Sequence, residues 1–293
     1  MSRARTALKF FRSLVLAAPA LAAAGAPPAS AENWQSLPVN PDVSIAYNPP
    51  AAASLQDAYQ ALKQRQVLEE LQHFLAPLHL PHHLLLQTAQ CNQVNAFYNS
   101  GDRSLTLCYE LVDYVIRLAP QTVSQDGLVT RQAAIFGNVI GILLHEGGHM
   151  MFDMFDVPRF GREEDAADEN SSFLALQFGP EVAQTIIRGY AYMYEVAHFN
   201  APNAATPMTA FADEHGTDQQ RLYNTLCLAY GGQPKLFAPF VDRGLLPKSR
   251  AAGCAAEYAQ IQYAFADTIL PFIDPALMAR VRQTEWLTPD ELK

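Results

Sequence analysis

The hydrophobic and polar positions change their period along the chain. Residues 54–75 carry apolar side chains at helical spacing, which predicts a helix that ends near Pro77. The shorter apolar runs at 84–91 and 95–110 are typical of strands, and NSGDR forms the turn inside the second run. Helical spacing then returns and predicts helices at about 109–118, 129–155, 163–178, 181–198, 208–230 and 254–271. The pattern therefore predicts an α+β fold that is mostly helical, with a small N-terminal antiparallel sheet.

The first 31 residues differ from the rest of the chain. Four basic residues precede the apolar run LVLAAPALAAAGA, and small residues follow it as far as Ala31; the basic residues are Arg3, Arg5, Lys9 and Arg12. This order predicts a secretory signal peptide over residues 1–31, and therefore a periplasmic or secreted protein. The alternative is a membrane anchor, which needs roughly 20 apolar residues. The run is shorter than that, and Pro19 interrupts it.

Residues 32–293 contain no internal repeat and no low-complexity linker, so we expect a single domain. The longest apolar stretch there, AAIFGNVIGILL, is too short to span a membrane and contains Asn138, so we expect no stable membrane insertion. Without the predicted signal peptide, 16 basic residues stand against 29 acidic ones, a net charge near −13. Nucleic acid and anionic membrane surfaces are poor partners for such a surface. The oligomeric state is left open.

Four cysteines form an even set in a chain that we expect to be exported. Oxidising compartments favour disulfides, so two bonds are expected, and four cysteines allow three pairings. The pairing between sequence neighbours is favoured, because Cys91 and Cys108 flank the predicted hairpin and Cys227 and Cys254 flank a short connection. Free thiols in the core are the alternative. A cysteine zinc site is disfavoured because no CxxC spacing occurs.

The string HEGGH at 145–149 has the pattern of a metal site. On a helix, His145 and His149 project from one face about one turn apart, so both imidazoles can reach a single cation. Glu146 lies beside that cation and can take a proton from water there. The motif is short and could also be a helix with two ordinary histidines. A catalytic zinc needs a third protein ligand, which has to come from elsewhere in the chain.

The acidic string GREEDAADE, which follows soon after, can supply that ligand. Glu164 and Asp168 are again four residues apart on one helix face. We expect Glu164 to be the third ligand of one Zn²⁺ per chain, and Asp168 to accept the free N–H of a ligating histidine. Glu163 and Asp165 are expected to point away from the site as part of an acidic helix start. A solvated acidic helix start is also the alternative for the whole string.

The downstream segment FADEHGTDQQRLYN contains His215 and Arg221, six residues apart. HExxH, then ExxAD, then His and Arg at this spacing resembles the gluzincin arrangement of HtpX-type and CAAX-processing membrane metalloproteases. A wider resemblance covers nearly all of the chain after residue 31. NAFYNSGDRSLTLCYEL, HEGGH, GREEDAAD, QQRLYNTLCLAYG and RAAGCAAEY are similar to bacterial exported proteins that are grouped as domain of unknown function 4344 and described as metallopeptidases.

The resemblance implies a zincin-like fold and a zinc peptidase that acts on peptides or proteins. It makes His215 a candidate to stabilise an oxyanion, and Arg221 a candidate to support His215 or to pair with an acidic residue. The chain departs from the membrane proteases because Gly216, not Pro, follows the histidine and because no membrane spans are expected. A surface or helix-capping histidine is therefore the alternative for His215.

The remaining candidates are weaker. Three histidines crowd one loop without an acidic or cysteine partner, and three tyrosines could approach the metal although a helical core stripe explains them better; these are His79, His82, His83, Tyr192, Tyr194 and Tyr223. Two other functions stay open: a zinc hydrolase of a non-peptide amide such as cell-wall material, and a non-catalytic zinc-containing binding protein. Glu146 argues against the last, because a purely structural site needs no base.

Overall fold

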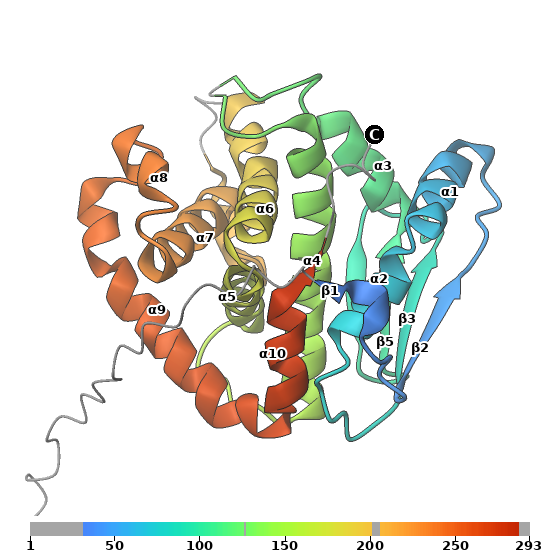
Figure 1. The fold of residues 1–293 in the computed structure, drawn as a ribbon. Helices are drawn as coiled ribbons and strands as arrows, with labels where there is room; N and C mark the ends of the chain where they lie inside the picture. Colours follow the sequence, from blue (N-terminus) through green and yellow to red (C-terminus); the bar gives the residue numbers. More distant parts are fainter. Residues whose placement is uncertain (1–31, 126, 201–205, 287–293) are drawn as a thin grey trace, which may run out of the picture. The chain divides into compact units, whose positions relative to one another are not determined.

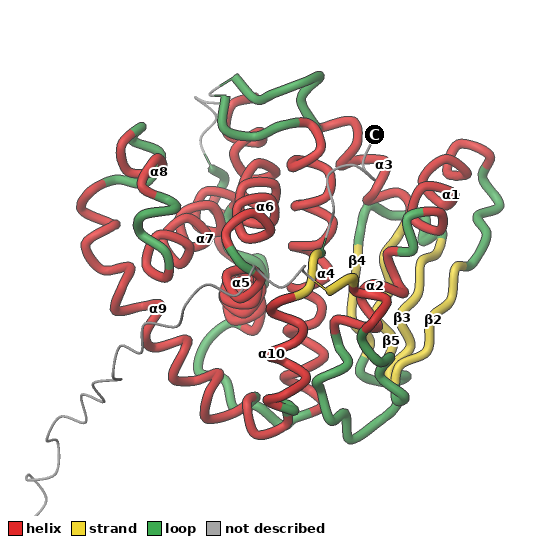
Figure 2. Tube along the Cα trace, in the orientation of Figure 1, coloured by secondary structure: helices red, strands yellow, loops and turns green. Residues whose placement is uncertain are grey.

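The computed structural model describes residues 32–125, 127–200 and 206–286. The predicted signal peptide lies outside these residues. Four strands form the main sheet in the order β2-β3-β5-β4 (Figure 2); they are β2 (Val43–Tyr47), β3 (Leu84–Ala89), β5 (Ser104–Cys108) and β4 (Ala96–Asn99). A two-residue parallel pair, β1 (Glu32–Asn33) with β6 (Thr284–Glu285), joins the beginning and end of the described chain.

The prediction of an antiparallel sheet was wrong, because the main sheet is mixed. β2, β3 and β5 run parallel, and only β4 is antiparallel to β5. Helices α1 (Gln56–Gln64) and α2 (Val67–Phe74) carry the chain back between β2 and β3, which makes those two strands parallel. Gln66 between them has a left-handed backbone (φ 58), so the single helix expected at 54–75 is divided in two.

Most of the described chain after β5 is helical, as the sequence predicts (Figure 1). The helices are α3 (Tyr109–Leu118), α4 (Arg131–Met154), α5 (Glu163–Ala175), α6 (Pro180–Asn200), α7 (Asp218–Gly232), α8 (Ala238–Asp242), α9 (Lys248–Thr268) and α10 (Pro275–Gln283). The helix expected at 208–230 begins only at Asp218, where Thr217 provides an N-terminal capping box. A short 3-10 helix, η4 (Met208–Ala212), precedes it. None of the described helices has the length and apolarity that a membrane span requires.

Helix α4 is the centre of the fold and lies between the sheet and the other long helices (Figure 1). Its sequence is apolar almost all round, and most of its side chains are buried. It crosses α6 at two glycines: a Cβ added to Gly137 would overlap the carbonyl oxygen of Thr185, and one added to Gly189 would overlap that of Ala133. The glycines therefore allow the two backbones to approach closely at this crossing.

Two disulfides are present, in the pairing between sequence neighbours that the sequence favours. Cys91–Cys108 joins the segment before β4 to the end of β5, with a Cα–Cα distance of 5.5 Å. Cys227–Cys254 joins α7 to α9, with a Cα–Cα distance of 5.1 Å. Both bonds anchor elements that flank α4 and α5.

The glycine crossing can be tested by substitution. Gly137→Ala should destabilise the fold by about 1–3 kcal/mol, because the methyl group must push α4 and α6 apart. Gly147→Ala on the same helix is the matched control, since no heavy atom of another described element lies within 4 Å of the added Cβ. Alanine favours a helix over glycine by about 1 kcal/mol, so the control should be neutral or stabilising. Denaturant unfolding of the metal-free variants measures both, and equal losses would contradict the close crossing.

Candidate metal centre

Helices α4 and α5 bring the two sequence motifs together. His145 and Glu146 are buried within α4, and His149 is half-buried one turn later. The first turns of α5 pack on this part of α4 because both surfaces are small there. A Cβ added to Gly148 would come within 3.2 Å of the Ala167 Cα, so the second glycine of HEGGH lets α5 approach. The candidate ligands therefore meet at a helix crossing.

Three donor atoms form a nearly regular triangle. The His145 Nε2 lies 3.2 Å from the His149 Nε2 and 3.0 Å from the Glu164 Oε2, and the His149 Nε2 lies 3.4 Å from the same oxygen. Ligands at the usual zinc distances of roughly 2.0–2.2 Å would stand about 3.3–3.6 Å apart around a tetrahedral ion. Two imidazole nitrogens and one carboxylate oxygen are also the donor types that zinc prefers. The residues present therefore fit a metal of this kind.

Hydrogen bonds at Nδ1 orient both rings. The His145 Nδ1 is 2.8 Å from Asp168 Oδ1, and the His149 Nδ1 is 2.9 Å from Glu163 Oε1. If each Nδ1 carries the hydrogen, each Nε2 presents a lone pair to the centre of the triangle. Burial opposes the charged form of His145, but the hydrogen bonds to Asp168 and Glu164 outweigh it and raise its pKa to about 9. The centre therefore attracts a positive charge.

Glu164, which provides the oxygen of this triangle, is a carboxylate. Burial alone would raise its pKa, but hydrogen bonds from His145, His149 and His215 hold the pKa well below its usual range. Glu164, His145 and His215 also form a second group that could hold a metal ion, because one donor atom of each lies within 4.8 Å of the other two. The carboxylate is therefore available to a cation without first losing a proton.

Asp168 is buried behind His145 and carries its charge within a network of hydrogen bonds. Arg221 donates to both of its oxygens, from Nε and Nη2, at 2.7 Å each, and the Tyr190 hydroxyl donates to Oδ1 at 2.6 Å. The Arg221 guanidinium also lies over the Tyr194 ring, 4.8 Å from its centroid. Burial opposes the charge of Asp168, but the bonds from Arg221 and His145 outweigh it and lower the pKa well below its usual range. Of the two roles that the resemblance implies for Arg221, the geometry matches pairing with an acidic residue.

Glu146 is held by the edge of the sheet. Its Oε2 accepts a hydrogen bond of 2.9 Å from the backbone N–H of Tyr98 in β4, and the Tyr98 hydroxyl donates to Asp153 at 2.8 Å. Burial raises the pKa of Glu146, against the opposing charges of His145 and His149. A raised carboxyl pKa brings this group closer to the range in which it can exchange protons near neutral pH.

His215 reaches the site from the loop between η4 and α7. Its Nε2 lies 2.9 Å from Glu164 Oε2, and its side chain is 39% exposed. Asp213 accepts the backbone N–H of His215 at 2.9 Å and lies 3.4 Å from its Nδ1. The hydrogen bond to Glu164 raises the pKa of His215, and partial burial opposes this. The loop therefore places the partly exposed imidazole of His215 beside the Glu164 corner of the triangle.

Residues 47–269 match the model of a protein family, DUF4344, which is described as "Putative metallopeptidase". This span is more than half of the chain and contains every residue of the candidate centre. The chain belongs to this family. No curated protein and no solved structure matches it.

Four contacts of this candidate metal centre do not follow from the sequence patterns. They involve Tyr98, Glu163, Tyr190 and Asp213. The expectation that Glu163 points away was wrong, because the first turn of α5 passes directly beside His149. Asp165 pairs with Arg162 instead, at 2.8 Å, and its Oδ1 lies beside Gly216. Acidic residues in a first helical turn look alike in sequence, so spacing alone could not separate these two.

The other candidates lie outside the centre. His79, His82 and His83 are exposed, and His83 contacts Ser44 Oγ at 2.9 Å. Tyr192 packs against a separate small apolar cluster, and Tyr223 is 38% exposed.

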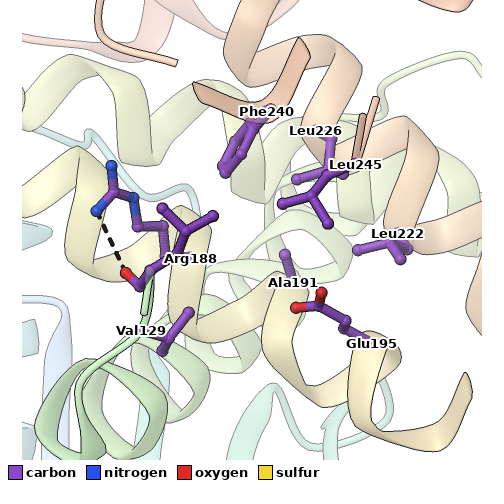
Figure 3. A pocket seen from close by; sticks show the side chains of 9 residues that line it. Val129, Arg188, Ala191, Glu195, Leu222, Leu226, Phe240 and Leu245 are labelled. Carbon is purple, nitrogen blue, oxygen red and sulfur yellow. Dashed lines mark hydrogen bonds between the residues drawn. The ribbon is translucent and has the colours of Figure 1, made fainter. Parts of the chain in front are cut away.

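A cavity of about 30 Å³ lies between α6, α7 and α8 (Figure 3). It is lined by apolar side chains such as Leu226 and Phe240, with Glu195 and Arg188 from α6. Arg188 turns back to donate to the Leu128 carbonyl at 3.3 Å (Figure 3). None of the residues of the candidate metal centre lines this cavity, so it is separate from the centre.

The buried pair of Arg221 and Asp168 predicts a large cost for losing one partner. Arg221→Ala should destabilise the metal-free protein by about 3–5 kcal/mol, because it leaves a buried carboxylate without its main counter-charge. Arg117→Ala is the control, since Arg117 forms an exposed pair with Asp113 at 2.7 Å. Such pairs contribute less than about 1 kcal/mol. Urea unfolding compares the two variants, and a similar small loss in both would refute the central role of the buried pair.

Proposed function

We propose that this metallopeptidase is a zinc-dependent enzyme of the cell envelope that hydrolyses peptide bonds. His145, His149 and Glu164 would hold the zinc ion, and Glu146 would be the general base. The observation that carries the proposal is the triangle of two Nε2 atoms and one Oε2 with sides of 3.0–3.4 Å, next to a buried glutamate. A bound zinc would lower the pKa of water from about 15.7 to about 7 and would polarise a carbonyl group.

Glu146 is suited to move the proton of the reaction. The Tyr98 N–H holds its Oε2, and the described residues provide no hydrogen bond to Oε1, so Oε1 is the atom that can accept a proton. Its raised pKa favours taking a proton from water and returning it to the leaving nitrogen. The backbone bond keeps this carboxylate in place during both transfers.

The outer edge of β4 supports a peptide as the substrate. The Asn95 carbonyl accepts a hydrogen bond from the Cys108 N–H of β5, at 3.2 Å. Backbone groups alternate along a strand, so those of Ala96 and Tyr98 face the outer edge, where the Tyr98 N–H meets Glu146. β4 is the edge strand and lies beside α4 (Figure 2). An extended peptide that adds to this edge would form main-chain hydrogen bonds and pass close to the base.

His215 would stabilise the negative charge that develops on the substrate oxygen. Asp213 lies near its Nδ1, which favours a hydrogen on that nitrogen in the neutral ring, while protonation places a donor on Nε2 as well. The raised pKa of His215 favours the protonated form. An N–H group aimed at a developing oxyanion is one of the larger contributions to catalysis.

The two disulfides support an exported protein, because such bonds persist in oxidising compartments. Residues 1–31 would then be the signal peptide that directs export. Peptides or proteins of the same compartment are the proposed substrates.

The base can be tested without knowing the natural substrate. Purified protein from residue 32 onward should contain about one zinc ion per chain and cleave members of a mixed peptide library or of a periplasmic protein extract. Glu146→Gln should retain the zinc and lower the cleavage rate by about 100- to 10,000-fold, the usual contribution of a positioned base. His145→Ala should lose the metal.

The same assay separates the alternatives. Release of products from cell-wall material with no peptide cleavage would replace the peptidase proposal with an amidase. Metal analysis that finds no zinc after purification without chelator would remove the basis of the whole site.

His215 gives a separate prediction. His215→Ala should leave the zinc content unchanged and reduce turnover by about 100- to 1000-fold, as expected for loss of one oxyanion donor. His83→Ala is the control, because that exposed histidine lies outside the centre. Full activity in the His215 variant would show that its contact with Glu164 has no role in the reaction.

A further inference from the structure

The two candidate histidine ligands are held by carboxylates in very different surroundings. Asp168, which holds His145, has a side chain only 5% exposed, and Arg221, whose side chain is 15% exposed, bonds to both of its oxygens. Glu163, which holds His149, has a side chain 43% exposed. The side of the centre that contains His149 is therefore the one open to water and ions.

Arg159 holds Glu163 in the position that contacts His149. Its Nη2 lies 3.0 Å from Glu163 Oε2, while Oε1 of the same carboxylate faces the His149 Nδ1 at 2.9 Å. Arg159 is itself fixed: its Nη1 donates to the Val157 carbonyl at 2.8 Å, and its guanidinium lies 5.4 Å from the centroid of the Phe152 ring. Arg159, Glu163 and His149 thus repeat, at the surface, the arrangement of Arg221, Asp168 and His145 in the core.

We propose that Glu163, held by Arg159, is a positioning residue for His149, and that this exposed pair sets how fast the metal leaves the centre. The inference rests on the proposed function only in that it takes the centre to bind zinc. Partners of this kind fix the orientation of a ligating imidazole. Water and salt compete with an exposed ion pair much more than with a buried one. His149 would therefore be the first ligand to release the metal, while His145 stays in place.

The first turn of α5 provides a matched control. Asp165 also pairs with an arginine, Arg162, and its side chain is 32% exposed. Replacing either acidic residue removes one negative charge from the same helix start, so effects on the helix dipole are similar. Of the two, Glu163 is the one that contacts a histidine of the centre. A difference between them therefore reports the contact with His149.

The experiment uses the protein loaded with Zn²⁺ and measures its release to an excess of chelator. Glu163→Ala should weaken zinc affinity by about 10- to 100-fold, mostly through faster release. Asp165→Ala should change the release rate by less than about twofold, since an exposed pair contributes little. Glu163→Gln keeps an oxygen that can accept from His149 and should lie between these values.

Three further measurements separate positioning from a general loss of structure. Arg159→Gln should speed release in the parent protein but add nothing in the Glu163→Ala background, because it acts through Glu163. Raising the salt concentration to 1 M should speed release from the parent protein and not from Glu163→Ala, since exposed charges are screened. The visible spectrum of the Co²⁺-loaded variants would show whether the ligand set is kept.

The outcomes distinguish this inference from the proposed function. Equal release rates in Glu163→Ala and Asp165→Ala, or no change in either, would overturn the positioning role and leave the peptidase proposal standing. If the variants show the expected release rates but the parent protein cleaves no peptide, the positioning role of Glu163 is supported and the peptidase proposal is contradicted. A parent protein that binds no zinc would overturn both.

Discussion

Four helices meet at the buried carboxylate of Asp168. It lies on α5 and accepts hydrogen bonds from His145 of α4, Tyr190 of α6 and Arg221 of α7. A buried carboxylate that loses its partners costs several kcal/mol, so all four helices must keep their mutual positions for the charge to stay paired. The orientation of His145, and with it the shape of the candidate metal centre, follows from how this one charge is buried.

Small residues on α4 make this network possible. The Tyr190 ring packs directly on Gly141, where a Cβ would come within 2.7 Å of the ring, and this close contact brings the hydroxyl to Asp168. Gly148 has the same effect for α5. The glycines that weaken α4 as an isolated helix therefore allow α5 and α6 to pack closely enough for Tyr190 to reach Asp168 and for Asp168 to reach the buried His145.

The centre has a rigid side and an open side. The rigid side contains Asp168 and Glu146, which are buried and tied to α7 and to the edge of the sheet. The open side contains His215 and Glu163, whose side chains are 39% and 43% exposed. This division is compatible with the proposed reaction, in which Glu146 and His145 would be held in place while substrate and metal would enter from the side of His215 and Glu163.

Contacts within one helix could be predicted from the sequence, because helical geometry alone sets them. The spacing of His145 with His149, and of Glu164 with Asp168, places each pair on one face wherever the helix lies. Most helix ranges and both disulfide pairings also followed from local patterns. Contacts between distant segments did not: the partner of Arg221 is 53 residues away, and the bond from Tyr98 to Glu146 joins a strand to a helix. The direction of β2 depended on the return path through α1 and α2, and Glu163 differed from Asp165 only once α5 was packed beside His149. Local spacing decides which side chains share a helix face, but only the packing of whole helices and strands decides which residues that face contacts.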